Sequence, residues 1–266
     1  MASCWAAKRV CPPGRLEQTT ERSKPTVHAI ISVVSEVPSS RTYDNPSRTI
    51  PALAGLAVAW GGTALLLSPA SRLLGRPDRL STKVLEQLVL WILLAATLAI
   101  VTLWEKQPLA SLGLRPFRWS SPAWGLGLAA MTMYVAMPML TWSLRAAGIP
   151  GFDTGMAKIL DLPVWFRIVA VLTAGIVEDT LFLGYAFTRL TWLLGSRWMA
   201  GIVATVVFSL LHLPNWGGGP VLTYFVAIGL AMSFFAWRRD LLANIFAHTV
   251  VDGMGLVVIP ALAGLR

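Results

Sequence analysis

Charged residues and cysteines are scarce in this chain. Asp, Glu, Lys and Arg together make up 13% of its 266 residues, about half of the share that is usual in a soluble globular protein. The only two cysteines, Cys4 and Cys11, lie near the N-terminus, so a disulfide framework and a cysteine-based metal site are excluded from the rest of the chain. The low charge, together with 55% hydrophobic residues, also excludes a chain that is disordered throughout.

Long hydrophobic runs take the place of the missing charge. From Ile50 onward, the chain contains apolar runs of roughly 16 to 25 residues, the length needed to cross a bilayer. The seven runs cover about 50–68, 84–104, 123–144, 164–188, 198–213, 220–237 and 241–264. We therefore expect an all-α fold, a polytopic integral membrane bundle of about seven transmembrane helices.

The net charge of +9 arises from 22 Lys and Arg against 13 Asp and Glu. These basic residues are spread over the connections and the N-terminal tail, and no basic stripe alternates with aromatic residues. In a membrane protein such residues set the topology and meet anionic lipid headgroups. We therefore expect a multi-pass protein of the cell (plasma) membrane, with the lipid bilayer as a partner and no nucleic acid among its partners.

The chain divides into three predicted parts. Residues 1–49 are rich in Pro, Ser, Thr and charge, and we predict a disordered tail there. Residues 50–163 hold the N-terminal transmembrane helices, and the segment near 105–119 mixes Leu and Trp with Lys and Arg, which predicts that it lies on the membrane surface. Residues 164–264 form the C-terminal helical core.

Titratable side chains are concentrated in this C-terminal core. An ionisable group inside an apolar span is costly, so each one needs a reason to be there. The first three spans carry almost none, apart from Glu86 near the start of the second. By contrast, the fourth, fifth and seventh spans carry five: Glu178, Asp179, His212, His248 and Asp252. This asymmetry predicts that the functional site lies in the core.

The spacing of these residues predicts which of them face one another. His248 and Asp252 are four residues apart, so on a helix they share one face, and Asn244 extends the same polar stripe by one turn. Phe208 and His212 have the same spacing. Each pair therefore shares one face of its helix.

Two chemistries fit this set of side chains. Glu178 and Asp179 are adjacent and point about 100° apart on a helix, so only one of them can aim squarely at a shared pocket. A carboxylate beside histidines can activate a water for attack on a carbonyl, while histidine donors stabilise the oxyanion. Alternatively, Glu178, His212 and His248 can ligate a divalent metal such as zinc, which performs the same activation.

Purely structural roles are the alternatives. They are an ion pair of Glu178 or Asp179 with Arg189 or Arg167, a helix-ending hydrogen bond of His212 to a loop carbonyl, and a hydrogen bond between His248 and Asp252. Such a bond contributes only about 0.6–2 kcal/mol in a membrane. A small proton-coupled transporter is a further alternative, because intramembrane Asp, Glu and His also carry protons. The convergence of all five groups on one end of the chain favours a site.

Three stretches of the core carry a family resemblance. They are VEDTLFLGYAFTRL from Val177, FSLLHL from Phe208 and LLANIFAHTVVDG from Leu241. Their order and spacing resemble the CPBP family, which comprises the CAAX proteases and bacteriocin-processing enzymes and is also called the Abi family of intramembrane proteases. The resemblance implies a CAAX prenyl protease 2-like endopeptidase with an all-helical fold. It would hydrolyse a peptide bond of a membrane-tethered or hydrophobic peptide or protein.

The resemblance also implies roles for individual residues. Glu178 would be the general base that activates water, His212 would help to hold that water, and His248 and Asp252 would bind the developing oxyanion. The supporting residues would be Asp179, Asn244 and Phe208. Although such enzymes carry the label of metalloproteases, a glutamate-activated water needs no cofactor, and no metal is assigned.

The first motif departs from the family pattern Glu-Glu-x-x-x-Arg. Asp179 stands at the second Glu, and Leu183 stands at the Arg. We expect from this alignment that Leu183→Arg leaves activity intact or raises it. The loss of the Arg also keeps open a catalytically inactive relative that acts as a membrane scaffold or immunity protein.

Overall fold

The computed structural model describes residues 46–77, 79–151 and 153–264. The predicted disordered tail lies outside these residues, except for 46–49, which are helical and belong to α2. Within the described residues no strand occurs, and the predicted all-α fold class is confirmed. The helices are α2 (Pro46–Leu56), α3 (Gly62–Leu67), α4 (Leu80–Ala99), α5 (Ser120–Met131), α6 (Met137–Ala146), α7 (Asp153–Leu160), α8 (Val164–Thr173), α9 (Phe187–Leu194), α10 (Arg197–Trp216), α11 (Gly218–Arg238), α12 (Leu241–Gly253) and α13 (Ile259–Leu262).

Several of these helices are joined into longer rods by π-helical turns. One turn lies between α2 and α3, one between α5 and α6, and one between α12 and α13. Two more, Ala174–Glu178 and Thr180–Ala186, connect α8 with α9. Residues 164–194 therefore form one helical rod, the α8–α9 rod. Because π turns change which side chains face a neighbouring helix, they are frequent at functional sites.

Six helical segments of the described chain are long and apolar enough to cross a membrane. They are Arg48–Leu67, Leu80–Trp104, Ser120–Ala146, Arg197–Pro214, Gly218–Arg238 and Leu241–Leu262. Each corresponds to a predicted span. The remaining predicted span, 164–188, lies in the α8–α9 rod, which is not among the six and much of which is buried between the other helices. The chain is an integral membrane protein.

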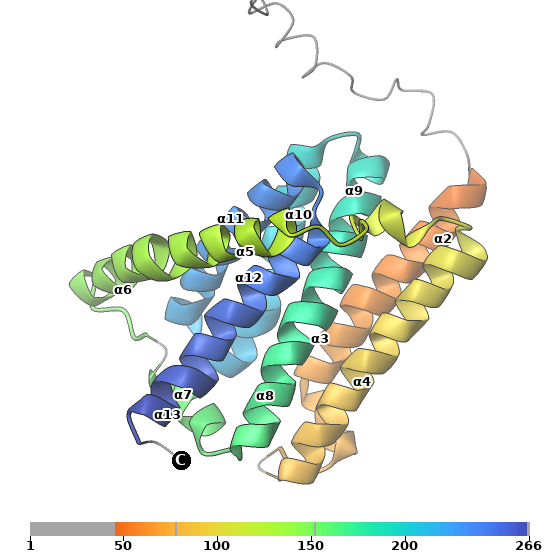
Figure 1. Ribbon diagram of the computed structural model, residues 1–266. Helices are drawn as coiled ribbons and strands as arrows, with labels where there is room; N and C mark the ends of the chain where they lie inside the picture. The colour runs from red at the N-terminus through yellow and green to blue at the C-terminus, as the bar shows by residue number, and fades with distance from the viewer. Residues whose placement is uncertain (1–45, 78, 152, 265–266) are drawn as a thin grey trace, which may run out of the picture. The chain divides into compact units, whose positions relative to one another are not determined.

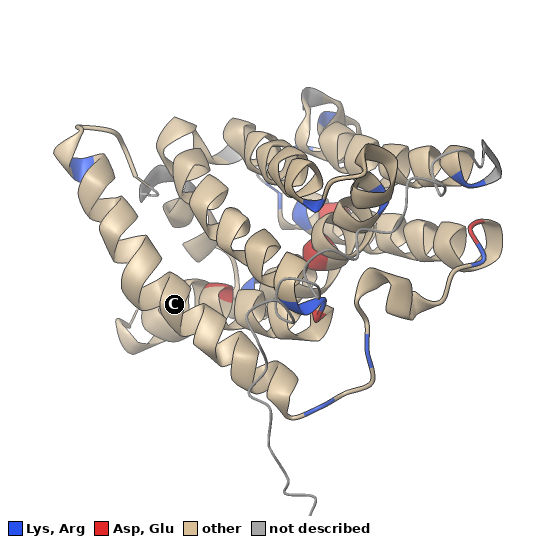
Figure 2. Ribbon diagram, turned by 90° about the horizontal axis from the view of Figure 1, so that it is seen from above, with Lys and Arg blue, Asp and Glu red and all other residues tan. Residues whose placement is uncertain are grey.

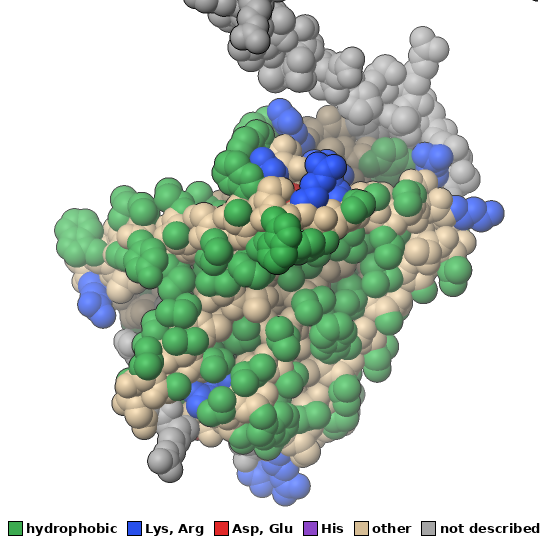
Figure 3. Space-filling view, in the orientation of Figure 1, with side chains coloured by type: hydrophobic (Ala, Val, Ile, Leu, Met, Phe, Trp, Pro, Cys, Tyr) green, Lys and Arg blue, Asp and Glu red, His purple; other side chains and the backbone are tan. Residues whose placement is uncertain are grey.

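The outer surface of the bundle suits contact with lipid. Leu103, Tyr134 and Trp142 are among many large hydrophobic side chains that are well exposed, a pattern that soluble monomers rarely show. Figure 3 shows one flank covered largely by hydrophobic side chains, with Lys and Arg mainly toward its upper and lower ends. Seen from above in Figure 2, Lys and Arg lie mostly at helix ends and in connections.

The α8–α9 rod lies in the middle of the helices (Figure 1). The α2–α3 rod and α4 lie side by side along one side of it, α10 and α11 form a hairpin behind it, and α12 crosses in front. The helix α5 packs along α12. Three parts of the chain therefore surround the rod: α2 to α4, the α10–α11 hairpin and α12. Residues far apart in the sequence are thus brought into one region.

Gly175 allows the rod to approach α12 closely. A Cβ atom at this position would overlap Thr249 Oγ1 and would lie 3.1 Å from the Ile245 carbonyl oxygen. Small residues of this kind let membrane helices pack backbone against backbone. The contact brings the turn that holds Glu178 beside the helix that holds His248.

The predicted surface segment 105–119 crosses the ends of several helices. Trp119 is 82% exposed, whereas Leu112 is fully buried, so the segment is anchored in the protein as well as exposed. Its first residue, Glu105, forms a buried ion pair with Arg189 of α9 and accepts a hydrogen bond from Tyr185 Oη at 2.9 Å. This polar cluster ties the segment to the α8–α9 rod.

Candidate active site

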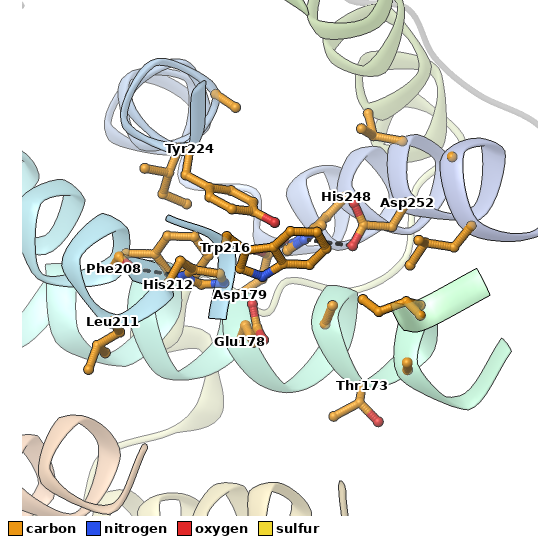
Figure 4. Close-up of a pocket in the computed structure, with 18 of the residues that line it drawn as sticks. Thr173, Glu178, Asp179, Phe208, Leu211, His212, Trp216, Tyr224, His248 and Asp252 are labelled. Carbon is orange, nitrogen blue, oxygen red and sulfur yellow. Dashed lines mark hydrogen bonds and ion pairs between the residues drawn. The ribbon is translucent and has the colours of Figure 1, made fainter. Parts of the chain in front are cut away.

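A cavity of about 510 Å³ lies where the α8–α9 rod, α10, α11 and α12 converge. All five titratable residues predicted for the site line this cavity: Glu178, Asp179, His212, His248 and Asp252. Figure 4 shows their side chains directed toward one another from the rod, α10 and α12. The predicted supporting residues Asn244 and Phe208 line the cavity as well.

His248 lies between two carboxylates. Its Nδ1 is 3.0 Å from Asp179 Oδ1, a hydrogen bond, and its Nε2 is 3.4 Å from Asp252 Oδ2, a longer ion-pair contact. Asp179 has 3% of its side chain exposed and Asp252 has 33%. Because an ionised carboxylate only accepts hydrogen bonds, this arrangement stabilises a His248 ring that carries a proton on both nitrogens.

Glu178 and Asp179 take different positions although they are adjacent in the sequence. Glu178 is the last residue of a π-helical turn and is half-buried at the cavity wall, whereas Asp179 is buried against His248. The sequence predicted that only one of them could aim at a shared pocket. Both line the cavity, and the carboxylate of Glu178 is not engaged in the contact that orients His248.

The orientation of His212 follows from a bond within its own helix. Its Nδ1 lies 2.8 Å from the carbonyl oxygen of Phe208, and a carbonyl oxygen can only accept, so Nδ1 carries the proton. On a neutral ring, Nε2 is then left with a lone pair. The imidazole is held between the rings of Phe208 and Tyr224, with centroid distances of 4.5 and 4.4 Å. The partner carbonyl lies one turn earlier in α10 and not in a loop.

Asn244 lies on the helix face that its spacing predicted, and its side chain bonds within α12. Its side-chain Nδ2 donates to the carbonyl oxygen of Asp240 at 3.1 Å, and its Oδ1 is buried without a hydrogen-bond partner. Asn244 thus lies on the face of α12 that carries His248 and Asp252, but its amide donates to the residue that caps the start of its own helix. Phe208, by contrast, contacts His212 directly.

The three possible metal ligands do not form a metal-binding group. Within the described residues, no set of three or more His, Cys, Asp or Glu side chains is placed to hold a metal ion. The nitrogens of His248 face two carboxylates, and Nδ1 of His212 faces a carbonyl oxygen. Glu178, His212 and His248 therefore do not fit a zinc site in this arrangement.

The arginines proposed as structural partners for the acidic pair are engaged elsewhere. Arg189 pairs with Glu105, and Nη1 of Arg167 donates to the carbonyl oxygen of Leu256 at 3.0 Å. The acidic residues of the cavity are thus set apart from the structural ion pair of the α8–α9 rod.

Leu183 corrects the expectation drawn from the family alignment. Its side chain is fully buried in the hydrophobic core, so it faces packed side chains and does not face the cavity. An arginine at this position would place an unpaired charge in that core, which is strongly unfavourable. The burial of Leu183 therefore argues against the expectation that Leu183→Arg is tolerated, and we now predict that this variant does not fold.

Tyr224 is a site residue that the sequence did not reveal. It lies on α11, its ring packs against His212, and Figure 4 shows its hydroxyl directed into the cavity. A tyrosine in an apolar span has no spacing relationship to residues on other helices. A phenol within a span that otherwise carries only apolar and small polar residues was the one available signal.

Comparison with known proteins bears on this core. Residues 160–254 match the family model described as type II CAAX prenyl endopeptidase Rce1-like. This part of the chain is therefore similar to the CAAX proteases. No curated protein and no solved structure matches the chain significantly. The matched CAAX protease segment contains all five titratable residues of the cavity, whereas Glu105, which pairs with Arg189 of that segment, lies outside it.

Proposed function

We propose that this protein is an intramembrane endopeptidase of the cell membrane. Its substrate is a membrane-tethered or hydrophobic peptide or protein, whose apolar part suits a cavity within the bundle. The observation that carries this proposal is that the cavity has a carboxylate base on one side and a charged hydrogen-bond donor on the other. Glu178 is available as a base on one side, and His248 is held by two carboxylates on the other.

Glu178 and His212 act together on the attacking water. The Glu178 carboxylate takes a proton from the water, and the lone pair on Nε2 of His212 accepts the second hydrogen as a hydrogen bond. The water oxygen forms a bond to the carbonyl carbon of the substrate, and the carbonyl oxygen gains the negative charge. Protonated Glu178 then gives its proton to the leaving nitrogen as the C–N bond breaks, so that a carboxylic acid and an amine are formed.

His248 stabilises the oxyanion. Asp179 fixes Nδ1–H, and the N–H on Nε2 points to where the carbonyl oxygen gains charge. The Asp252 contact to Nε2, at 3.4 Å, is long for a hydrogen bond, so a substrate oxygen can compete for this donor. Asp252 is then a positioning residue that keeps His248 charged and oriented. The family resemblance implied that Asp252 itself binds the oxyanion, whereas in this proposal Asp252 acts only through His248.

The hydroxyl of Tyr224 provides a second donor near the same position. Tyr224 contacts His212 and lines the cavity, so it can donate either to the oxyanion or to the water. No step requires a metal or another cofactor. A zinc chelator such as 1,10-phenanthroline should therefore leave cleavage unchanged.

The test compares peptide termini in cells that express the wild type, Glu178→Gln or Asp161→Asn. Asp161 is an exposed carboxylate before α8, so its amide variant controls for the chemical change alone. New N- or C-termini should appear with the wild type and Asp161→Asn, and they should be absent with Glu178→Gln although this variant remains inserted and folded. Identical termini in all three strains would instead favour an inactive relative that serves as a scaffold or immunity protein. Proton-dependent uptake in liposomes without any peptide product would favour a transporter.

A further inference from the structure

Three arginines cluster away from the cavity, where α11 passes into α12. Arg238 is the last residue of α11, Arg239 follows it, and Arg115 lies in the segment 105–119. Figure 3 shows Lys and Arg side chains gathered near the upper end of the apolar flank. The three arginines lie outside the lining of the cavity that holds Glu178, so they form a separate surface feature.

Arg239 is held in an unfavourable backbone conformation. Its φ is +52°, in the left-handed region that non-glycine residues rarely adopt. Its guanidinium lies over the ring of Phe235, 5.2 Å from the centroid, and its Nη2 is 3.5 Å from the carbonyl oxygen of Ser111. Gly113, at φ +83°, lets the Phe235 ring and the Arg239 carbonyl oxygen pack against its backbone, because a Cβ there would overlap the ring. The surroundings thus fix a positive charge at this point.

Arg238 is fixed beside it by aromatic rings. Its guanidinium lies 4.5 Å from the ring centroid of Trp124 and 5.4 Å from that of Trp237. Its Nε is buried and has no hydrogen-bond partner. A guanidinium carries five N–H donors, and rings satisfy none of them as an oxygen would. The enclosed Nε cannot reach a ligand, but Arg238 is only partly buried, and its terminal Nη groups can donate to an anion at the surface.

The nearby acidic groups are already engaged. Asp240 accepts hydrogen bonds from Ser121 Oγ at 2.8 Å and from the backbone N–H of Ala243 at 3.1 Å. Glu105 is paired with Arg189. Burial first, and then the positive charges of Arg115 and Arg189, lower the pKa of the Arg239 guanidinium. The three arginines thus outnumber the one neighbouring carboxylate, Asp240, and positive charge is in excess here.

We propose that Arg115, Arg238 and Arg239 bind the phosphate of an anionic membrane lipid. Arginine forms paired, charge-assisted hydrogen bonds to phosphate oxygens. The position fits a lipid headgroup because one membrane-capable segment ends at Arg238 and the next begins at Leu241. Exposed Trp119 and Trp237 lie at the same end, as expected of aromatic residues at a membrane interface.

The test measures lipid binding to the full-length protein in detergent. Phosphatidylglycerol is titrated against the wild type, Arg115→Gln and Arg239→Asn, with native mass spectrometry and the midpoint of thermal unfolding as readouts. Asn is chosen because it tolerates the left-handed conformation, and Arg115 is an exposed loop residue, so both variants should fold. Arg197→Gln is the matched control, since Arg197 is exposed at the start of α10 and lies outside the cluster.

Each cluster variant should lose about fivefold in affinity for phosphatidylglycerol, and Arg197→Gln should retain wild-type affinity. Phosphatidylcholine should bind all four proteins equally and weakly. An equal loss in Arg197→Gln would overturn the site, because it would mean that general surface charge attracts the lipid. Equal stabilisation by inorganic phosphate at the same phosphate concentration would overturn the lipid assignment. Because binding is read out without cleavage, the result is independent of the proposed peptidase activity.

Discussion

The hydrogen bond between His248 Nδ1 and Asp179 Oδ1, 3.0 Å long, joins two helices of the bundle through a pair of residues 69 positions apart in the sequence. It places a buried negative charge behind the imidazole, while Asp252 faces the other nitrogen. A second pair of residues far apart in the sequence, Glu105 and Arg189, holds the α9 part of the same rod. Of these two polar contacts of the α8–α9 rod, the first thus belongs to the cavity and the second does not.

Replacing Asp179 by Asn tests the role of this contact in catalysis. The change removes a negative charge beside His248, so the doubly protonated ring is favoured only at lower pH. Peptide cleavage should fall by at least about a hundredfold, by analogy with the buried Asp of a Ser-His-Asp triad, and the alkaline limb of the pH–activity profile should move to lower pH.

Asp161→Asn serves as the control for this change, since Asp161 is exposed outside the cavity. Glu178 and Asp252, which also face His248, remain in place. A lower rate with an unmoved pH profile would show that Asp179 is only structural.

Glu105→Gln tests the buried ion pair. The variant leaves the guanidinium of Arg189 buried without its counter-charge, and breaking a buried pair in this way costs about 3–5 kcal/mol of stability. Chemical unfolding in detergent should show this loss. The double variant Glu105→Met with Arg189→Met should be considerably more stable than Glu105→Gln, because it leaves no unpaired charge; equal instability of the two would contradict the ion-pair explanation.

Leu183→Arg should prevent accumulation of folded protein, because the side chain at this position is enclosed by the hydrophobic core. Leu183→Met, which conserves volume, should cost less than about 1.5 kcal/mol and should keep cleavage intact. Expression and monodispersity in detergent are the measurements. If Leu183→Arg were folded and at least as active as the wild type, the position would belong to the site after all.

Gly175→Ala tests the close approach of the α8–α9 rod to α12. The added methyl group would overlap Thr249 Oγ1, so Thr249 must rotate. It would also lie 3.1 Å from the Ile245 carbonyl oxygen and 3.3 Å from the Thr249 nitrogen, so the α12 backbone must give way slightly, and His248 moves with it. Cleavage should fall at least about tenfold, because small misplacements of catalytic groups are costly. Gly127→Ala in α5 is the matched control, since a Cβ there meets no atom within 4 Å, and it should leave cleavage unchanged.

The positions of the spans and the local geometry of α12 were predictable from the sequence. Run length and low charge identify membrane helices because an unpaired backbone or charge is too costly in lipid. The i, i+4 spacing placed His248 and Asp252 on one face because helix geometry is a local property. The five acidic and histidine residues of the C-terminal core that line the cavity were predictable too, since each is an ionisable group within an apolar span. Lys83, Glu86 and Tyr224 also line the cavity, and the sequence did not assign them to it.

The tertiary structure alone decided how these residues are paired. Whether Asp179 contacts His248 and whether Leu183 points into the core depend on how the helices rotate against one another. Membrane helices are apolar on both their packed and their lipid-facing sides, so no amphipathic pattern marks the inner face. The π turns of the α8–α9 rod also change the facing of the residues that follow them. Sequence therefore determined which groups lie in the membrane, and packing determined which of them meet.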